Sequence, residues 1–150
     1  MKNTWAVLAL AGCYAGNYST LTAPFVGSRV TVGCLDVAVA LTDDETAPSP
    51  VVAYSFGNNC FHQTIVDLSA VRVFGVQADR TRVELAAYDP RRELRPMQLD
   101  ALTAGSERIA YRSAAAPAPQ EVCVDLGRLD ADAPPSEQWK CLTMTDGGAR

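Results

Sequence analysis

Five cysteines offer the most distinctive chemistry in this chain, and their spacing separates the possible uses. Cysteine thiolates bind zinc, form disulfides or react with other groups. Structural zinc sites contain cysteine pairs only a few residues apart, and no two cysteines here are that close. The spacing therefore predicts no metal site, and no cofactor motif accompanies it. The odd total leaves one thiol outside any set of disulfides. The five residues are Cys13, Cys34, Cys60, Cys123 and Cys141.

The remaining polar residues form no recognisable catalytic arrangement. His62 is the only histidine, and Asp67 is the nearest acidic residue along the chain. A histidine base needs a nucleophile or substrate within reach and usually a carboxylate that orients it. Ser106 follows Gly105, but the serine elbow of hydrolases requires a strand-to-helix turn. The chain has no glycine-rich phosphate loop and no His-Glu-x-x-His motif. The sequence therefore predicts a protein that is not an enzyme.

Two short acidic segments, 43–45 and 130–132, are the candidates for a calcium site. Calcium takes about six to eight oxygen ligands in a concave arrangement. Adjacent acidic residues on a loop that is rich in proline more often point into solvent. We therefore predict solvated loops, with calcium binding as the open alternative.

The aromatic residues indicate which parts of the surface could bind a partner. Phe61 lies beside the turn signal Asn58-Asn59, and we expect its side chain to be exposed. Phe61, His62, Arg91 and Arg92 are the predicted partner surface. The other aromatic residues in or near predicted strands are expected mainly in the core, because a sandwich needs large residues on its inner faces. They are Tyr54, Phe56, Phe74, Tyr88, Tyr111 and Trp139.

The N-terminus has the features of an export signal. Lys2 supplies a positive charge, residues 5–11 are apolar, and Gly12 and Cys13 follow. The apolar run is too short to span a bilayer, so it fits the core of a secretory signal peptide. Residues 10–13, Leu-Ala-Gly-Cys, resemble the lipobox of bacterial lipoproteins. The alternative is a first strand or a buried helical turn of a cytosolic protein.

This resemblance implies a membrane anchor on Cys13. In that family residues corresponding to 1–12 are removed, the cysteine thiol receives a diacylglycerol, and the new amino group is often acylated, for example with palmitate. The next residue is Tyr14 rather than an acidic residue, which implies the outer membrane of the cell envelope. Whether the protein faces the periplasm or the outside stays open. Residues 13–27 are small and polar without periodicity, which is typical of a flexible tether.

Lipidation of Cys13 would leave four cysteines, which can pair in three ways. Residues opposite each other in an antiparallel hairpin have a nearly constant sum of residue numbers. The predicted loop 43–50 is centred at a sum of 93, and the predicted loop 130–136 is centred at 266. Two cysteine pairs have nearly these sums, 94 and 264. We therefore predict the disulfides Cys34–Cys60 and Cys123–Cys141.

Composition and charge limit the remaining possibilities. The 150 residues are 48% hydrophobic and 20% charged, which fits one folded domain and disfavours wholesale disorder. Thirteen basic and 17 acidic residues give a net charge of −4. This balance predicts no nucleic-acid partner, because nucleic-acid binders present a basic face.

Hydrophobic residues alternate with polar ones from Ser28 onward, which is typical of half-buried strands. We predict an all-β fold over residues 28–144. The expected architecture is an antiparallel, immunoglobulin-like β-sandwich of about eight strands with two disulfides. Residues 145–150 are expected to form a disordered tail. The alternation changes phase at Gly33-Cys34, which predicts a β-bulge there, and residues 103–106 are predicted to form a turn.

The combined expectation is a bacterial envelope lipoprotein, anchored to the membrane through Cys13. Its sandwich is predicted to act as a non-catalytic binding or assembly module, with another envelope protein as its partner. A calcium- or glycan-binding sandwich is the first alternative, and a small hydrolase with a dispersed site is the second.

Overall fold

The computed structural model of the chain describes residues 29–42, 50–113, 118–129 and 137–144. These residues contain no helix that is long and apolar enough to cross a membrane. Several predicted features lie outside the described residues: the signal peptide 1–12, the lipidated Cys13, the tether 13–27, the acidic segments 43–45 and 130–132, and the tail 145–150.

Alternating sequences form short strands in the described part of the chain, with little helix. The helical pieces are a 3-10 turn, η2 (Leu68–Ala70), and a single turn of helix, α1 (Pro90–Glu93). The strands are β1 (Arg29–Val32), β2 (Leu35–Thr42), β3 (Val51–Asn58), β4 (Thr64–Val66), β5 (Arg72–Val76), β6 (Arg82–Ala87), β7 (Met97–Leu99), β8 (Ala104–Ser113), β9 (Glu121–Asp125) and β10 (Trp139–Thr143).

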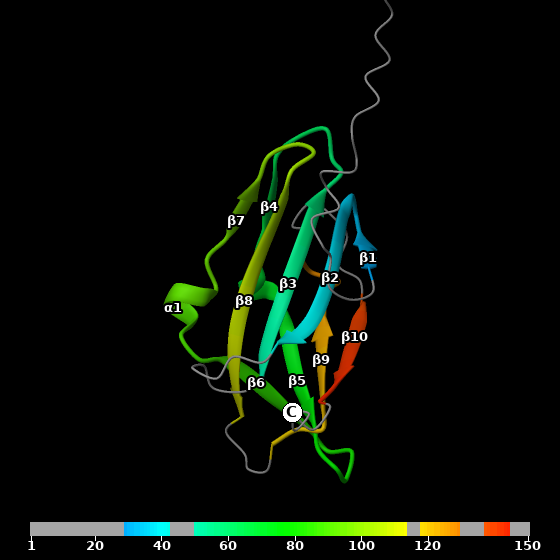
Figure 1. Cartoon of the computed structure of the whole chain (residues 1–150), viewed down its shortest axis with the longest axis vertical. Coiled ribbons are helices and arrows are strands. Elements are labelled where there is room, and N and C mark those ends of the chain that lie inside the picture. Colours follow the sequence, from blue (N-terminus) through cyan, green and yellow to red (C-terminus); the bar gives the residue numbers. More distant parts are fainter. Residues whose placement is uncertain (1–28, 43–49, 114–117, 130–136, 145–150) are drawn as a thin grey trace, which may run out of the picture.

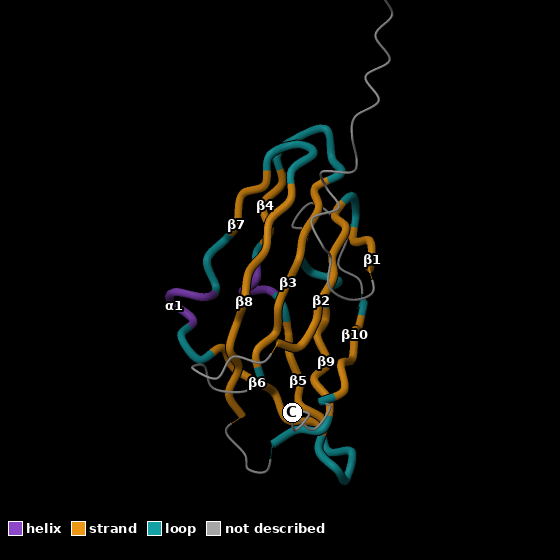
Figure 2. The backbone as a smooth tube through the Cα atoms, in the orientation of Figure 1, coloured by secondary structure: helices purple, strands orange, loops and turns teal. Residues whose placement is uncertain are grey.

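The strands form an antiparallel sheet of eight strands in the order β1-β2-β3-β8-β6-β5-β9-β10, and β4 pairs with β7 in a separate ribbon. Strand β8 connects the two halves of the large sheet. Its residues 104–110 pair with β3, and its residues 111–113 pair with β6. Figure 1 shows β1, β2, β3 and β8 in front of β5, β9 and β10, and Figure 2 shows the same two layers as a tube. The prediction of an all-β antiparallel sandwich is therefore confirmed.

The register agrees with the hairpin arithmetic. Leu35 of β2 lies opposite Asn58 of β3, which gives the predicted sum of 93. Cys123 of β9 lies opposite Cys141 of β10, with a sum of 264. The structure contains both predicted disulfides, with Cα–Cα distances of 5.4 Å for Cys34–Cys60 and 4.0 Å for Cys123–Cys141.

Two local predictions were wrong. Gly33 and Cys34 form the two-residue turn of the β1–β2 hairpin rather than a bulge, because Val32 pairs with Leu35 across it. Gly33 has a φ of 60°, a conformation that favours glycine in such turns. The predicted turn at 103–106 begins earlier, at Asp100. Gly105 already pairs with Phe56, so it belongs to a strand.

The core lies between the two halves of the sheet and consists of alternate residues of its strands. Val37 and Val39 of β2, Val73 of β5 and Val124 of β9 are all buried. Tyr54 and Tyr111 are also buried, and their hydroxyl oxygens are 2.7 Å apart. Burial is the main reason that the pKa of Tyr54 rises well above its usual value, and the neighbouring Tyr111 adds to this. The pair thus satisfies two polar groups inside an apolar core.

Candidate functional site

One end of the sandwich is formed by two loops that come from distant parts of the chain. Residues 59–63 connect β3 to β4, and residues 100–103 connect β7 to β8. We call them the apical loops. Figure 1 shows both connections at the same end of the molecule. The pairing of Thr64 with Leu99 brings the two loops together, because each loop adjoins one of these paired residues.

A single buried amide, that of Asn58 at the end of β3, holds the apical loops. Its Nδ2 donates to the carbonyl oxygens of His62, Leu99 and Asp100 at 3.0, 3.1 and 2.9 Å. Its Oδ1 accepts a hydrogen bond from the backbone N–H of Cys60 at 2.9 Å. The amide therefore fixes the backbone of both loops, and its complete burial shields these hydrogen bonds from water.

The disulfide Cys34–Cys60 adds a covalent link from the first apical loop, residues 59–63, to the β1–β2 turn. Beside it, the backbone N–H of Asn59 donates to the carbonyl oxygen of Cys34 at 3.0 Å. Gln63 donates from its side chain to a carboxylate oxygen of Asp100 at 2.9 Å, which joins the two apical loops on their exposed side. These contacts hold residues 59–63 in one conformation.

The rigid loop carries an unusually exposed aromatic residue. The side chain of Phe61 is 88% exposed, which agrees with the sequence prediction. Two other large apolar residues at this end are also exposed, Ile65 on β4 and Leu102 on the second apical loop. Leu102 has a φ of 59°, a conformation that costs energy for a branched side chain. An exposed aromatic side chain on a fixed backbone is a suitable anchor for a protein partner, because such a loop loses little conformational entropy when the partner binds.

The other predicted partner residues divide between this end and a different part of the surface. His62 lies on the apical loop and is exposed. Asp67, the acid nearest to it in sequence, accepts hydrogen bonds from the backbone N–H and hydroxyl of Ser69 and so caps η2 rather than orienting the imidazole. Arg91 and Arg92 lie on α1, which contacts β6 and β8. The structure therefore does not bring the two arginines together with Phe61 and His62 (Figure 1).

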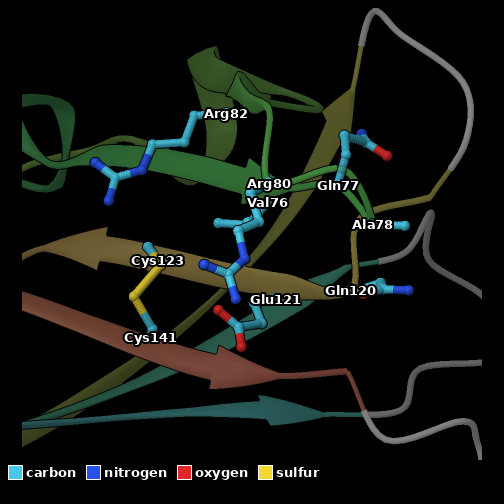
Figure 3. A pocket seen from close by; sticks show the side chains of 9 residues that line it. All are labelled: Val76, Gln77, Ala78, Arg80, Arg82, Gln120, Glu121, Cys123 and Cys141. Carbon is cyan, nitrogen blue, oxygen red and sulfur yellow. A yellow bond between two sulfur atoms is a disulfide. The ribbon is translucent and has the colours of Figure 1, made fainter.

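A second candidate surface lies on the outer face of the β6-β5-β9-β10 half. It contains a shallow pocket of about 400 Å³ beside the Cys123–Cys141 disulfide. Two guanidinium groups, of Arg80 and Arg82, and the carboxylate of Glu121 supply the charges of its lining. Figure 3 shows the disulfide joining neighbouring strands, with Arg80 directed toward Glu121. Potential ligand atoms of Glu121 and both cysteines lie within 4.8 Å of one another, but the disulfide occupies the two sulfur atoms.

An aromatic pair lies next to this pocket. The ring centroids of Phe74 and Trp139 are 5.5 Å apart, and the guanidinium carbon of Arg72 lies 5.0 Å from the Phe74 centroid. The expectation that these aromatic residues belong to the core was wrong. Trp139 is 38% exposed and Phe74 is half-buried, because both lie on the outward face of their strands. Tyr88, at the end of β6, is also exposed, at 54%.

Sequence reasoning missed two buried polar residues that shape these surfaces. The sequence predicts only a turn at Asn58-Asn59, whereas the structure places Asn58 at the end of β3. Asp125 is buried and accepts hydrogen bonds from the backbone N–H groups of Gly127 and Gln138 at 3.1 and 3.2 Å. An aspartate that is followed two residues later by glycine is a usable signal for such a turn.

Comparisons with known proteins show the fold and leave the function open. No family model matches the sequence, and no curated protein matches it. The yjhA protein from Bacillus subtilis has a similar structure, with a TM-score of 0.54 and 9% identity over 79% of this chain and 97% of that chain. The secreted protein MPT63 from Mycobacterium tuberculosis overlaps with a TM-score of 0.39 and 15% identity over 69% and 88% of the two chains. This second overlap is too loose to define a common fold.

Proposed function

We propose that this protein is a lipid-anchored lipoprotein of the bacterial outer membrane whose β-sandwich is a non-catalytic binding module. The proposal assigns an immunoglobulin-like architecture to the sandwich. It places the binding surface on the apical loops and takes another envelope protein as the partner. The sequence Leu10-Ala11-Gly12-Cys13 supports the anchor, and the two disulfides are compatible with an oxidising compartment.

One observation carries the assignment of the binding surface: Phe61 is 88% exposed on a loop that is held by a buried amide and a disulfide. Large aromatic side chains dominate the binding energy of many interfaces. A loop that is already fixed loses little conformational entropy on binding. The nearby Ile65 and Leu102 would extend the apolar contact around this anchor.

Photo-cross-linking in the producing organism tests the proposal. A photoreactive phenylalanine analogue replaces Phe61 in one variant and Tyr88 in the matched control. Tyr88 is also an exposed aromatic residue, but it lies at the end of β6 away from the apical loops. We expect one discrete cross-linked envelope protein from position 61 and none from position 88. The proposal fails if neither position gives a product or if both give the same products.

A second variant separates binding from folding. Replacing Phe61 by Ser removes the anchor, and its exposure means that the free energy of unfolding should change by less than about 0.5 kcal/mol. The partner identified by cross-linking should co-purify with the unmodified protein, and its co-purification with this variant should fall to background. Undiminished capture would show that Phe61 is not the anchor.

A further inference from the structure

We propose that the Cys123–Cys141 disulfide is a site of thiol–disulfide exchange with an external thiol, and that the attacking thiolate reaches the sulfur of Cys141. This disulfide lies on the outer sheet face, away from the apical loops, so its reactivity is independent of the function proposed for those loops. Its place in the sheet, the different surroundings of its two cysteines and the charges of the adjacent pocket all favour exchange at Cys141.

The strand register places the disulfide in a row of side chains across the outer face. Glu84 of β6 lies opposite Phe74 of β5, and Phe74 lies opposite Cys123 of β9. Cys123 in turn lies opposite Cys141 of β10. Directly opposite residues point to the same side of a sheet. The row therefore runs Glu84, Phe74, Cys123, Cys141, and β10 is the last strand of this sheet in the described residues.

The two disulfides of the molecule differ in accessibility. Cys141 is exposed, whereas neither cysteine of the apical disulfide is: Cys34 is partly buried and Cys60 is only 4% exposed. The hydroxyl of Thr64 also contacts the Cys60 sulfur at 3.3 Å. Exchange requires that a thiolate reach a sulfur atom. We therefore expect Cys123–Cys141, the more exposed disulfide, to react faster than Cys34–Cys60.

The neighbours of the disulfide in this row determine which of its two sulfur atoms a thiolate can reach. A thiolate attacks one sulfur from the side opposite the other sulfur, along the line of the S–S bond. For Cys123 that line leads over β5, where Phe74 is packed against Trp139 and Arg72. For Cys141 the line leads outward across the edge strand β10. Cys141 is therefore the electrophilic sulfur, and Cys123 supplies the leaving thiolate.

The adjacent pocket provides a favourable charge for this reaction. Arg80 and Arg82 line it together with both cysteines, and Glu121 is the one acidic residue among the described residues of its lining. Two cationic groups against one carboxylate leave a net positive charge, which attracts an incoming thiolate and stabilises the departing one. Figure 3 shows these side chains around the disulfide.

The reaction balances with a thiol as the only co-reactant. A thiolate forms a bond to the Cys141 sulfur, the S–S bond breaks, and its electron pair leaves on Cys123, which then takes up a proton. A second thiol attacks the external sulfur of this mixed disulfide and releases Cys141 as a thiol. Two thiols are thereby oxidised to one disulfide, and the protein disulfide is reduced by two electrons.

Glutathione and peptide mass spectrometry test the proposal on the oxidised full chain. Samples are quenched with acid at intervals, free thiols are alkylated, and the chain is digested with trypsin. Cleavage after Arg112, Arg128 and Lys140 yields the peptides 113–128 and 141–150, which carry Cys123 and Cys141 separately. We expect Cys123–Cys141 to be reduced at least roughly tenfold faster than Cys34–Cys60, with the first glutathione adduct on Cys141. Equal rates, faster loss of Cys34–Cys60, or adducts mainly on Cys123 would overturn the proposal.

Two variants test the steric argument. Phe74→Ala removes the ring that obstructs Cys123, so glutathione adducts should appear on Cys123 as well as Cys141. Tyr88→Ala, which truncates another exposed ring that lies after the end of β6 and outside this row, should leave the adduct on Cys141 alone. An unchanged adduct pattern in Phe74→Ala would show that the ring does not direct the attack.

Discussion

Replacement of Asn58 by Ala is the most informative test of how the apical loops are held. The substitution removes one acceptor and two donor hydrogens from a completely buried position. Three of the groups left behind are themselves in buried hydrogen bonds: the backbone N–H of Cys60, the carbonyl oxygen of Leu99 and the hydroxyl of Thr64. The Thr64 hydroxyl also contacts the Cys60 sulfur at 3.3 Å and keeps that partner, which leaves two buried groups without one. The carbonyl oxygens of His62 and Asp100 belong to exposed residues and can accept from water instead.

The magnitude follows from these two groups. A buried polar group that loses its partner costs about 1 to 3 kcal/mol. Two such groups lower the free energy of unfolding by about 2 to 6 kcal/mol in Asn58→Ala. The matched control is Asn59→Ala, whose side chain donates to Asp36 at 2.9 Å in a partly buried position. It should lose only about 0.5 to 1.5 kcal/mol, which is the net value of an ordinary hydrogen bond.

Urea unfolding followed by circular dichroism measures both values. A loss in Asn58→Ala that is no larger than the loss in Asn59→Ala would refute the role assigned to the amide. Asn58→Asp provides an independent test. It replaces the amide nitrogen, which donates to three carbonyl oxygens, by a carboxylate oxygen that those carbonyl oxygens repel. These carbonyl groups should raise the pKa of the new carboxyl, so this variant should regain stability as the pH falls and the carboxyl becomes a donor.

Three further predictions concern the core and the second disulfide. Gly75→Ala should destabilise the fold by about 1 to 3 kcal/mol in urea unfolding, because a Cβ there would lie 2.8 Å from the Pro119 ring; no loss would show that the ring can move. The pKa of Tyr54 is raised by folding, so stability should fall above about pH 10 by up to about 1.4 kcal/mol per pH unit. Tyr54→Phe should weaken this alkaline loss in a pH series, and an unchanged slope would contradict the assignment. Replacing Cys123 and Cys141 together by Ser should cost about 3 kcal/mol, since the bridge spans 18 residues; an unchanged unfolding midpoint would refute this.

The sequence contained enough information for the strands and the disulfides because both depend on local patterns. Period-two alternation identified β2 and β3, and the loop centre between them gave the sum of 93 that the register shows. The same symmetry placed Cys123 opposite Cys141. A hairpin has one degree of freedom, its register, and the turn and the hydrophobic pattern both restrict it.

The failures come from contacts that a local pattern does not contain. A phase change in the alternation is produced equally by a bulge and by a tight turn, so Gly33-Cys34 was ambiguous. Alternation also shows that Trp139 and Cys141 share a face without showing that this face is the outer one. Two partners of Asn58, Leu99 at the end of β7 and Asp100 on the second apical loop, are 41 and 42 residues away in sequence, so the role of Asn58 depends on the β4–β7 pairing.

Intact mass spectrometry of the protein from its native membrane fraction, with and without reductant, tests the envelope assignment most directly. We expect a chain that begins at Cys13 and carries acyl groups. Reduction should add four hydrogens, two for each of the two disulfides. An unmodified chain that begins at Met1, with five free thiols and no mass change on reduction, would refute the envelope assignment.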